Sequence, residues 1–574
     1  MGARGSGMFW FAIFTWGGMV MFDVMGQKVL VTSPLGTVIG LSEKSVGGKP
    51  YAAFRGIPYA KPPTGSRRFM PPERLESWGE KLEAFRDGAE CLQMDVLVTL
   101  NITGREDCLY LNVFTPITNE TENLPVIFFI HGGGFISGSS NSLFYSPGYF
   151  MDEDVVLVTF NYRLGPLGFM STEDKVMPGN MGLLDMIAAL QWVQQNIRHF
   201  GGDPRAVTIM GESAGAGAVH HLILSPRARG LFRAAISESG SALCPWAVAE
   251  GHRRGAEGIA SILGCPTMSS ADLLLCLQQV PAEAIVGLST KLWEWQYFPL
   301  LFGPRVDRET DGPVLPDEPI NMMLEGCFSR VPWLTGINKD EGVLLALTPL
   351  GNETALKDLN ERWEALCPLA MDFSFTTPVR CDRRSACNQI KTRYFRGKNI
   401  SQDNASQLIE VFGDRWFKVC GVEAADLHSR FSPTYFYYFK GNGKRKFLDV
   451  LFAGPRQFLL NKSAEAHAGV GHGDDLLYLF DAKMIPPITT MEPMAFAIKN
   501  AFVRLWTDFA TYLDPTPKGK EVELPSWPLY TEKKPYTYII DAQPIVELGN
   551  IGEKRKTFWN SLPIQENNPL QTGF

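Results

Sequence analysis

The stretch Val207-Thr-Ile-Met-Gly-Glu-Ser-Ala-Gly215 leads from strand-forming residues through a glycine to a single serine. Residues 216–224, which follow, predict a helix. A G-x-S-x-G pattern between a strand and a helix forms a sharp turn that lifts the serine hydroxyl clear of the sheet. Because the chain has 55 glycines, the pattern by itself could arise by chance. The flanking strand and helix weaken that explanation, so Ser213 is the candidate nucleophile.

The segments around this turn alternate between strands and helices. Residues 126–130 and 155–160 are continuous apolar runs, as expected of strands buried on both faces of a parallel sheet. Residues 183–200 have apolar side chains near helical spacing and end at a Gly-Gly-Asp-Pro turn. Residues 107–113 predict an alternating strand. Further strands are expected at 234–241, 331–337 and 434–439.

This order predicts the α/β class, with a large, mostly parallel central sheet flanked by helices. The span from about 350 to 426 has mixed polarity and is interpreted as a helical insertion over the sheet. We find no internal repeat, low-complexity tract or convincing linker after residue 30. We therefore expect residues 27–574 to form a single domain.

The composition is that of a globular protein, with 45% hydrophobic and 20% charged residues. A net charge of −7 argues against nucleic acid as a partner, because phosphate-binding domains carry a basic face. Two short basic runs, Arg383-Arg384 and Lys444-Arg-Lys446, are interpreted as solvated loops. No metal or other cofactor is expected, and the sequence leaves the oligomeric state open.

The N-terminus predicts export from the cell. Arg4 precedes an apolar run over residues 8–22, which is shorter than the roughly 20 residues of a membrane helix, so residues 1–26 are expected to be a cleaved signal peptide. The last residues, 570–574, show no anchor-type tail, and no stable membrane anchor is expected. The ten cysteines include no C-x-x-C pair, which favours disulfides. Six glycosylation sequons also fit a secreted, extracellular protein: Asn101, Asn119, Asn352, Asn399, Asn404 and Asn461.

A serine nucleophile needs a histidine to accept its proton and a carboxylate to orient that histidine. Among the eight histidines, His472 is flanked by glycines in a loop where an imidazole can project, and we favour it over His467. The acid should follow a strand between the serine and the histidine, and Asp340 and Glu341 both qualify. The other histidines are less suitable: His131, His199, His220, His221, His252 and His428.

Acyl transfer also needs N–H donors where the oxyanion forms. The run Gly132-Gly133-Gly134 directly follows the apolar strand at 126–130 and has no side chains to block a substrate. A glycine turn between two elements would be the simpler explanation of this run alone. Its order relative to the serine turn favours an oxyanion hole, with the Ala214 N–H as a third donor.

The chain resembles the type-B carboxylesterase/cholinesterase family of α/β hydrolases from about residue 37 to about residue 559. The motifs that carry the resemblance are Arg55-Gly-Ile-Pro-Tyr-Ala60, Glu106-Asp-Cys-Leu-Tyr-Leu-Asn-Val113, His131-Gly-Gly-Gly-Phe135, Asn161-Tyr-Arg-Leu-Gly165, Phe200-Gly-Gly-Asp-Pro204 and Gly211-Glu-Ser-Ala-Gly215. The form Gly471-His-Gly-Asp-Asp-Leu-Leu-Tyr478 is similar to that of arthropod esterases.

This resemblance implies a serine carboxylesterase without a cofactor, acting on small-molecule esters. It implies Ser213 as nucleophile, Glu341 as acid and His472 as base. The oxyanion hole would be Gly133, Gly134 and Ala214, with Glu212 and Ser239 as supporting polar groups. The implied disulfides are Cys91–Cys108 and Cys265–Cys276, and the other six cysteines stay unassigned.

Departures from the family pattern limit the class of ester that we expect as substrate. The segment between Cys91 and Cys108 lacks the tryptophan with which acetylcholinesterases bind choline, so uncharged, apolar esters are favoured over choline esters. Juvenile-hormone esterases typically carry Gln where this chain has Glu212 and Met186, which disfavours a hormone esterase as the alternative. A second alternative is a non-catalytic adhesion or ligand-sequestering relative, although such relatives usually lose a triad residue and this chain keeps all three.

Overall fold

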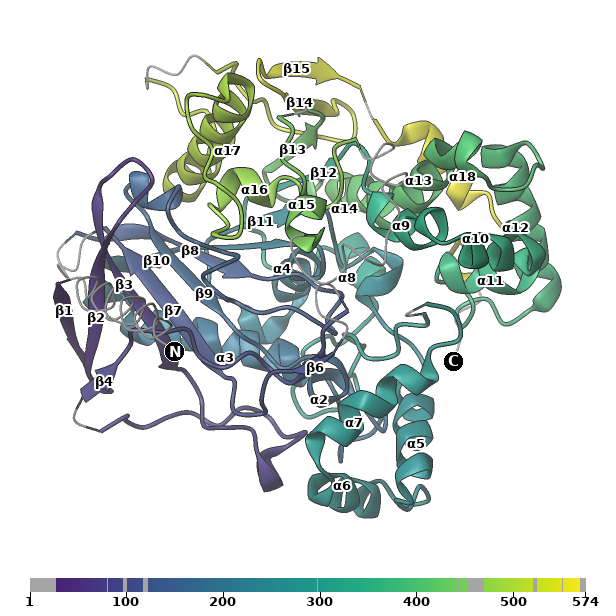
Figure 1. Ribbon diagram of the computed structural model, residues 1–574, viewed down its shortest axis with the longest axis horizontal. Helices are drawn as coiled ribbons and strands as arrows, with labels where there is room; N and C mark the ends of the chain where they lie inside the picture. The colour runs from purple at the N-terminus through teal and green to yellow at the C-terminus, as the bar shows by residue number, and fades with distance from the viewer. Residues whose placement is uncertain are drawn as a thin grey trace, which may run out of the picture.

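The computed structural model describes residues 27–79, 81–96, 101–116, 122–296, 298–441, 443–452, 469–519, 524–549 and 551–567. Its centre is a 13-stranded sheet (Figure 1). In spatial order, twelve of the strands are β1 (Lys28–Ser33), β2 (Gly36–Lys44), β3 (Pro50–Pro58), β7 (Tyr110–Thr115), β9 (Val156–Phe160), β8 (Leu124–Ile130), β10 (Gly202–Glu212), β11 (Ala234–Glu238), β12 (Trp333–Asn338), β13 (Thr434–Phe439), β14 (Tyr536–Ile540) and β15 (Ile545–Leu548). The thirteenth, β4 (Lys81–Glu83), pairs with β2, and β5 (Gln93–Met94) pairs with β6 (Ile102–Thr103) in a separate small sheet.

The middle of the sheet is parallel, from β9 through β8, β10, β11, β12 and β13 to β14. Strands β9, β11 and β12 are buried along their whole length, because helices cover both faces of a parallel sheet. Antiparallel strands complete both edges. The predicted α/β class with a mostly parallel sheet is therefore confirmed.

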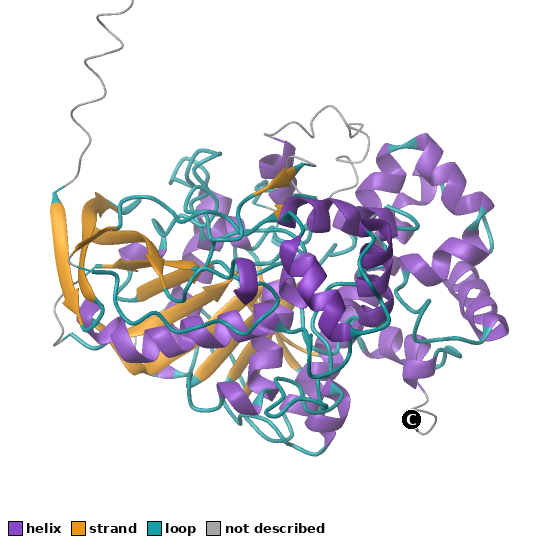
Figure 2. Cartoon of the chain, turned by 90° about the horizontal axis from the view of Figure 1, so that it is seen from below, coloured by secondary structure: helices purple, strands orange, loops and turns teal. Residues whose placement is uncertain are grey.

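The helices lie around this sheet and beyond its end (Figures 1 and 2). They are α2 (Gly165–Phe169), α3 (Met181–Asn196), α4 (Ala214–Leu224), α5 (His252–Leu263), α6 (Ser270–Gln279), α7 (Ala282–Ser289), α8 (Pro319–Leu324), α9 (Val343–Gly351), α10 (Glu353–Glu361), α11 (Trp363–Ala370), α12 (Arg380–Phe395), α13 (Ala405–Gly413), α14 (Val419–His428), α15 (Phe447–Phe452), α16 (Leu476–Leu479), α17 (Pro493–Tyr512) and α18 (Glu553–Asn560). Helices α9 to α13 and α18 form a lobe beyond the sheet, which we call the outer helical lobe.

The structure confirms the predicted insertion, because residues 350–426 are mostly helical. Two other expectations need correction. Strand β7 does not alternate, since all of its residues after Tyr110 are buried between neighbours. Arg383 and Arg384 are not in a loop but on α12.

Some expectations concern residues outside the described part of the chain. These are the signal peptide at 1–26, the alternative base His467, and the sequons at Asn119 and Asn461. Among the helices that are described, none is by itself long and apolar enough to cross a membrane. The bent pair Ser270–Gln279 and Ala282–Leu292 meets the criterion of length and composition only when taken together.

Candidate active site

The serine turn joins β10 to α4 at the carboxyl end of the parallel strands. Ser213 has φ 58° and ψ −123°, a backbone conformation rarely adopted by non-glycine residues. Its N–H donates to the Glu238 carbonyl of β11 at 2.9 Å. A Cβ on Gly215 would lie 2.0 Å from the carbonyl oxygen of Ile130, so only glycine fits beside β8. The strained turn is thus held by both neighbouring strands.

Two segments from distant parts of the chain meet beside this serine. The Nδ1 atom of His472 lies 2.8 Å from Oε2 of Glu341, and both side chains are buried. The other carboxylate oxygen of Glu341 accepts a 2.6 Å hydrogen bond from the backbone N–H of Asn338 at the end of β12. The structure therefore pairs His472 with Glu341, whereas Asp340 accepts the N–H of Val470 instead. This geometry fits a histidine oriented by a carboxylate.

The Nε2 atom of His472 carries no hydrogen bond in the described part of the chain. It lies 3.2 Å from Oε1 of Glu212, without hydrogen-bond geometry. Ser213, half-buried, lines the same pocket as His472 and Glu212. Catalytic hydrogen bonds are often loose before substrate binds, so this arrangement leaves the imidazole available to the serine hydroxyl.

The pKa values of these buried groups depend on one another. Burial by itself would lower the pKa of His472, but the nearby carboxylates of Glu212 and Glu341 outweigh it and raise the pKa to about 9. Burial raises the pKa of Glu212 to about 8. Above that pH the ionised Glu212 stabilises the imidazolium together with Glu341. Glu212 is therefore placed to tune the proton affinity of His472.

The glycine run after β8 forms one wall of the pocket. Gly133 and Gly134 line it together with Ser213. Gly133 has φ +111°, and a Cβ there would lie 1.9 Å from the Ser137 carbonyl oxygen. Among the described contacts, neither of these glycine N–H groups nor that of Ala214, in the first turn of α4, donates a hydrogen bond within the protein. Three donors are thus available near the serine.

The rest of the pocket is apolar. Glu212 and His472 are the ionisable side chains among its described lining residues. The apolar walls include Trp246, Phe298, Leu300, Leu344, Leu345, Trp416, Phe417 and Phe447. Such a lining suits an uncharged ligand, whose orientation a few polar groups can fix.

Part of this wall comes from a short π-helix, Asp414–Lys418, between α13 and α14. Phe417 packs against the imidazole of His472 with ring centroids 4.3 Å apart. The Trp246 indole N–H donates to the Trp416 carbonyl at 2.8 Å. A disulfide between Cys244 and Cys420 joins the two segments just beyond these contacts. π-Helices are frequent at functional sites, and this one brings two aromatic side chains to the pocket.

Sequence reasoning missed a buried polar network behind the Glu341–His472 pair. The Asn338 amide donates to Asp475 and to the Gly471 carbonyl, and the Tyr437 hydroxyl also donates to Asp475. Asn338 is the last residue of β12, and Asp475 lies within the histidine motif just before α16, but neither position signals a hydrogen bond between them. Burial raises the pKa of Asp475 to about 6. The network holds the histidine loop against β12 and β13.

Ser239, implied as a supporting polar group, follows Glu238 on β11 and has φ 56°. Its hydroxyl is buried and has no hydrogen-bond partner among the described residues. Met186 is buried on α3 and is not among the residues that line the pocket. Of these two positions, Ser239 alone adjoins the serine turn, through the Glu238 carbonyl that holds Ser213.

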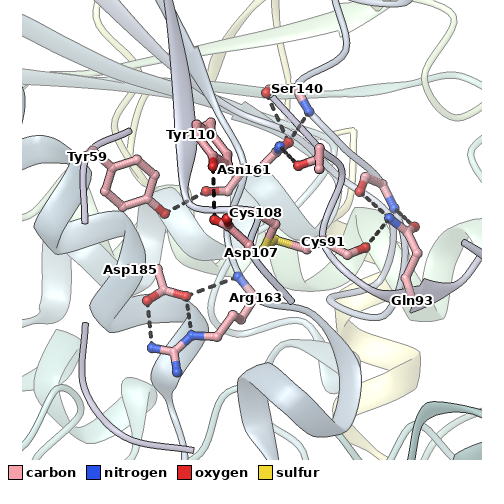
Figure 3. Close-up of a disulfide and its surroundings, with 12 residues drawn as sticks. Tyr59, Cys91, Gln93, Asp107, Cys108, Tyr110, Ser140, Asn161, Arg163 and Asp185 are labelled. Carbon is pink, nitrogen blue, oxygen red and sulfur yellow. Dashed lines mark hydrogen bonds and ion pairs between the residues drawn. A yellow bond between two sulfur atoms is a disulfide. The ribbon is translucent and has the colours of Figure 1, made fainter. Parts of the chain in front are cut away.

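Polar contacts also connect the segments around the Cys91–Cys108 disulfide (Figure 3). The Arg163 guanidinium binds both carboxylate oxygens of buried Asp185, at 2.7 and 2.8 Å. The Asn161 side chain accepts the N–H of Ser140, and the Tyr59 hydroxyl donates to the Asn161 carbonyl. These contacts tie the sequence motifs at 55–60 and 161–165 to one another.

Four disulfides are present among the described residues. The expected pairs Cys91–Cys108 and Cys265–Cys276 are both formed. Two further pairs are Cys244–Cys420 and Cys367–Cys387. Cys327 and Cys381 are exposed and unpaired. No group of three or more His, Cys, Asp or Glu side chains in the described ranges could hold a metal ion.

A serine on a strand-to-helix turn, a buried Glu–His pair and a glycine run at one edge of a parallel sheet define an α/β hydrolase. The family model of the carboxylesterase family matches residues 27–559. The chain is 34% identical over 561 residues to venom carboxylesterase-6 of Apis mellifera, covering 96% of this chain and 97% of that protein. It is 35% identical to juvenile hormone esterase of Tribolium castaneum, with 85% and 84% covered.

A solved structure is also similar. The crystal structure of juvenile hormone esterase from Manduca sexta, with OTFP covalently attached, matches with a TM-score of 0.80 and 29% identity, covering 93% of this chain and 99% of that chain. The chain belongs to the carboxylesterase family and is a carboxylic ester hydrolase.

Proposed function

We propose that the protein is a secreted serine carboxylesterase that hydrolyses uncharged, apolar esters through an acyl-enzyme on Ser213. The observation that carries this proposal is the 2.8 Å contact between His472 Nδ1 and Glu341, in the pocket that Ser213 lines. A histidine whose Nδ1 is held by a carboxylate presents Nε2 as a base.

In the proposed reaction, His472 Nε2 accepts the hydroxyl proton while Ser213 Oγ attacks the ester carbonyl carbon. The N–H groups of Gly133, Gly134 and Ala214 stabilise the negative oxygen of the tetrahedral intermediate, each contributing about 3 kcal/mol. The imidazolium then protonates the leaving alcohol, and its charge is stabilised by Glu341. His472 next activates a water, which releases the carboxylic acid and restores the serine.

The lining supports an uncharged substrate. No arginine or lysine is among the described residues that line the pocket, so an anionic ester has no partner there. A cationic ester would face Glu212, whose pKa burial raises to about 8, rather than a permanent charge. In the segment between Cys91 and Cys108, Val96 is the described residue that lines the pocket. Apolar contact is therefore the main source of binding free energy.

Extracellular function is supported by the disulfides and by the apolar N-terminal segment. On this proposal residues 1–26 are removed and residues 27–574 act as a single domain. The sequons at Asn101, Asn352 and Asn399 lie on exposed residues. Asn404 is half-buried and donates its side-chain amide to the Asn399 carbonyl, so glycosylation there would disturb a local turn.

A juvenile-hormone-like ester is the second candidate substrate, supported by the similarity to hormone esterases of two insects. Glu212 argues against it, because hormone esterases typically carry Gln at that position. A panel of esters graded by acyl and alcohol size, including a hormone-like methyl ester, distinguishes the two. A kcat/KM for the hormone-like ester far above that of every simple ester would replace the proposed substrate class.

The test of the mechanism uses a p-nitrophenyl ester and an organophosphate. We expect turnover, one-to-one titration by the organophosphate, and loss of both in Ser213→Ala. An unchanged rate in Ser213→Ala would exclude the proposed nucleophile. Stoichiometric capture with very slow turnover would instead support the ligand-sequestering alternative.

A further inference from the structure

Helix α12 concentrates positive charge in a chain that is acidic overall. Residues 380–398 contain seven Lys and Arg residues against a single acid, Asp382, a net charge of +6 in a protein whose net charge is −7. Such a segment creates a strong local potential of sign opposite to the rest of the surface. The helix lies at the outer side of the outer helical lobe (Figure 1).

Few of these charges are neutralised by the protein. Arg384 forms an ion pair with Glu364 at 3.1 Å, and both side chains are more than half exposed. The other six basic side chains form no ion pair within the described chain. Arg380, Arg393 and Arg396 are exposed. The charge is therefore directed at solvent, where an external anion can reach it.

The basic face is also rigidly supported. On the inner side of α12, Ala386, Cys387 and Ile390 are buried. Cys387 is joined to Cys367 of α11 by a disulfide, and the Trp363 indole donates to the Cys387 carbonyl. A helix anchored in this way loses little further conformational entropy when it binds a ligand.

A shallow groove, wide open to solvent, runs along the outer face of α12. We call it the α12 groove; its lining residues are Cys381, Arg384, Ser385, Asn388, Gln389, Thr392, Arg393 and Phe558. These residues repeat every three or four positions, so they follow one face of the helix. Arg384 and Arg393 thus lie at opposite edges of this face, with hydroxyl and amide side chains between them.

We infer that the α12 groove binds a sulfated polysaccharide chain. Arg384 and Arg393 of the groove are about 14 Å apart along the helix axis, and Arg380 adds a guanidinium group one residue before the groove begins, so a single small anion cannot contact all three. Guanidinium groups bind oxyanions with paired hydrogen bonds, and the amides and hydroxyls between them suit sugar hydroxyls. A repeating anionic polymer is complementary to this basic face.

Other anionic macromolecules fit the groove less well. A membrane-binding helix carries exposed apolar residues to insert, and Val379 is the only large apolar side chain exposed between 370 and 400. Single-stranded nucleic acid needs free aromatic rings for stacking, whereas the ring of Phe558 is covered by the Arg393 guanidinium at 5.8 Å. Extracellular sulfated glycans are also what a secreted enzyme would meet, which is the one point that depends on the proposed location.

The experiment uses heparin as the probe and the full glycoprotein. The groove variant is Arg380→Gln/Arg384→Gln/Arg393→Gln. We expect the wild type to bind heparin-agarose at about 0.15 M salt, and the groove variant to bind at least about tenfold more weakly. Short heparin fragments that cannot span Arg384 to Arg393, about 14 Å along the helix axis, should compete poorly.

A matched variant, Arg229→Gln/Lys533→Gln/Lys534→Gln, removes the same charge from exposed positions elsewhere. We expect it to bind heparin like the wild type. Equal weakening of both variants, or no heparin binding by the wild type, would overturn the inference. The wild type should also be tested for binding to phosphatidylserine vesicles. If that binding resists salt as well as heparin binding does, the groove binds membranes and not a sulfated glycan. Thermal unfolding and p-nitrophenyl ester hydrolysis, both expected to be unchanged, separate this result from misfolding and from failure of the proposed catalytic mechanism.

Discussion

Replacing Glu212 by Gln should shift the pH dependence of hydrolysis. The ionised carboxylate lies 3.2 Å from His472 Nε2 and stabilises the imidazolium. At this distance the attraction is about 1.3 kcal/mol even with the dielectric constant of bulk water, which corresponds to about one pKa unit. Burial of both groups strengthens this attraction where Glu212 is ionised, above a pH of about 8. Glu212→Gln should therefore lower the pKa of His472, which is about 9, by about one unit.

The sign follows from the role of the imidazole as a base. Activity requires neutral His472. If the pKa of His472 is raised, activity appears only at higher pH; if it is lowered, activity persists to lower pH. The acidic limb of kcat/KM for a neutral p-nitrophenyl ester should accordingly move to lower pH in Glu212→Gln. We expect the plateau rate to fall by less than about tenfold, because Gln keeps the shape of the side chain.

Glu341→Gln is the matched control. It also removes one charge near His472, but it breaks the contact that orients Nδ1, so the plateau rate should fall by about 10⁴-fold. An acidic limb that stays in place in Glu212→Gln, or that moves to higher pH, would refute the proposed electrostatic role of Glu212. A comparable loss of plateau rate in both variants would show that Glu212 orients rather than tunes the histidine.

Three further substitutions test the surroundings of the site. Phe417→Ala removes a ring from the pocket wall, and the ratio of kcat/KM for bulky over small acyl esters should rise about tenfold in an ester panel. Cys244→Ser/Cys420→Ser should lower the free energy of unfolding by about 2–5 kcal/mol in denaturant titrations. Arg163→Met leaves buried Asp185 without its cation and should cost about 3–5 kcal/mol in the same assay, while Asp185→Asn/Arg163→Met should recover part of that loss.

The parallel strands could be predicted because continuous apolar runs have few alternatives in a large chain. Strand β13 was predicted at its observed bounds, 434–439, and β8 within two residues. The antiparallel edge was harder to predict, since β1 alternates between buried and exposed residues over only six positions. Local pattern therefore identifies the buried centre of a sheet better than its half-exposed edges.

The active site, like the sheet, could be predicted from the sequence only in part. Ser213 and Glu341 lie in motifs shortly after β10 and β12, and His472 lies in a glycine-flanked loop motif, so sequence could propose all three. The contact of Phe417 with His472 could not be predicted, because it depends on how an insertion folds back over the sheet. The basic pair Arg383-Arg384 is predicted as a loop because two neighbouring charges carry no periodicity, and few apolar residues mark the inner face of α12.

Because of the disulfide between Cys244 and Cys420, the pocket wall can be covalently fixed only after the later part of the chain has been synthesised. The nucleophile turn and Trp246 leave the ribosome long before Cys420, which is 176 residues further along the chain than its partner. The pocket wall carried by Trp416 and Phe417 therefore closes late, and its covalent closure requires an oxidising compartment. A chain produced in a reducing compartment would form the strands that hold the serine but would lack this tether.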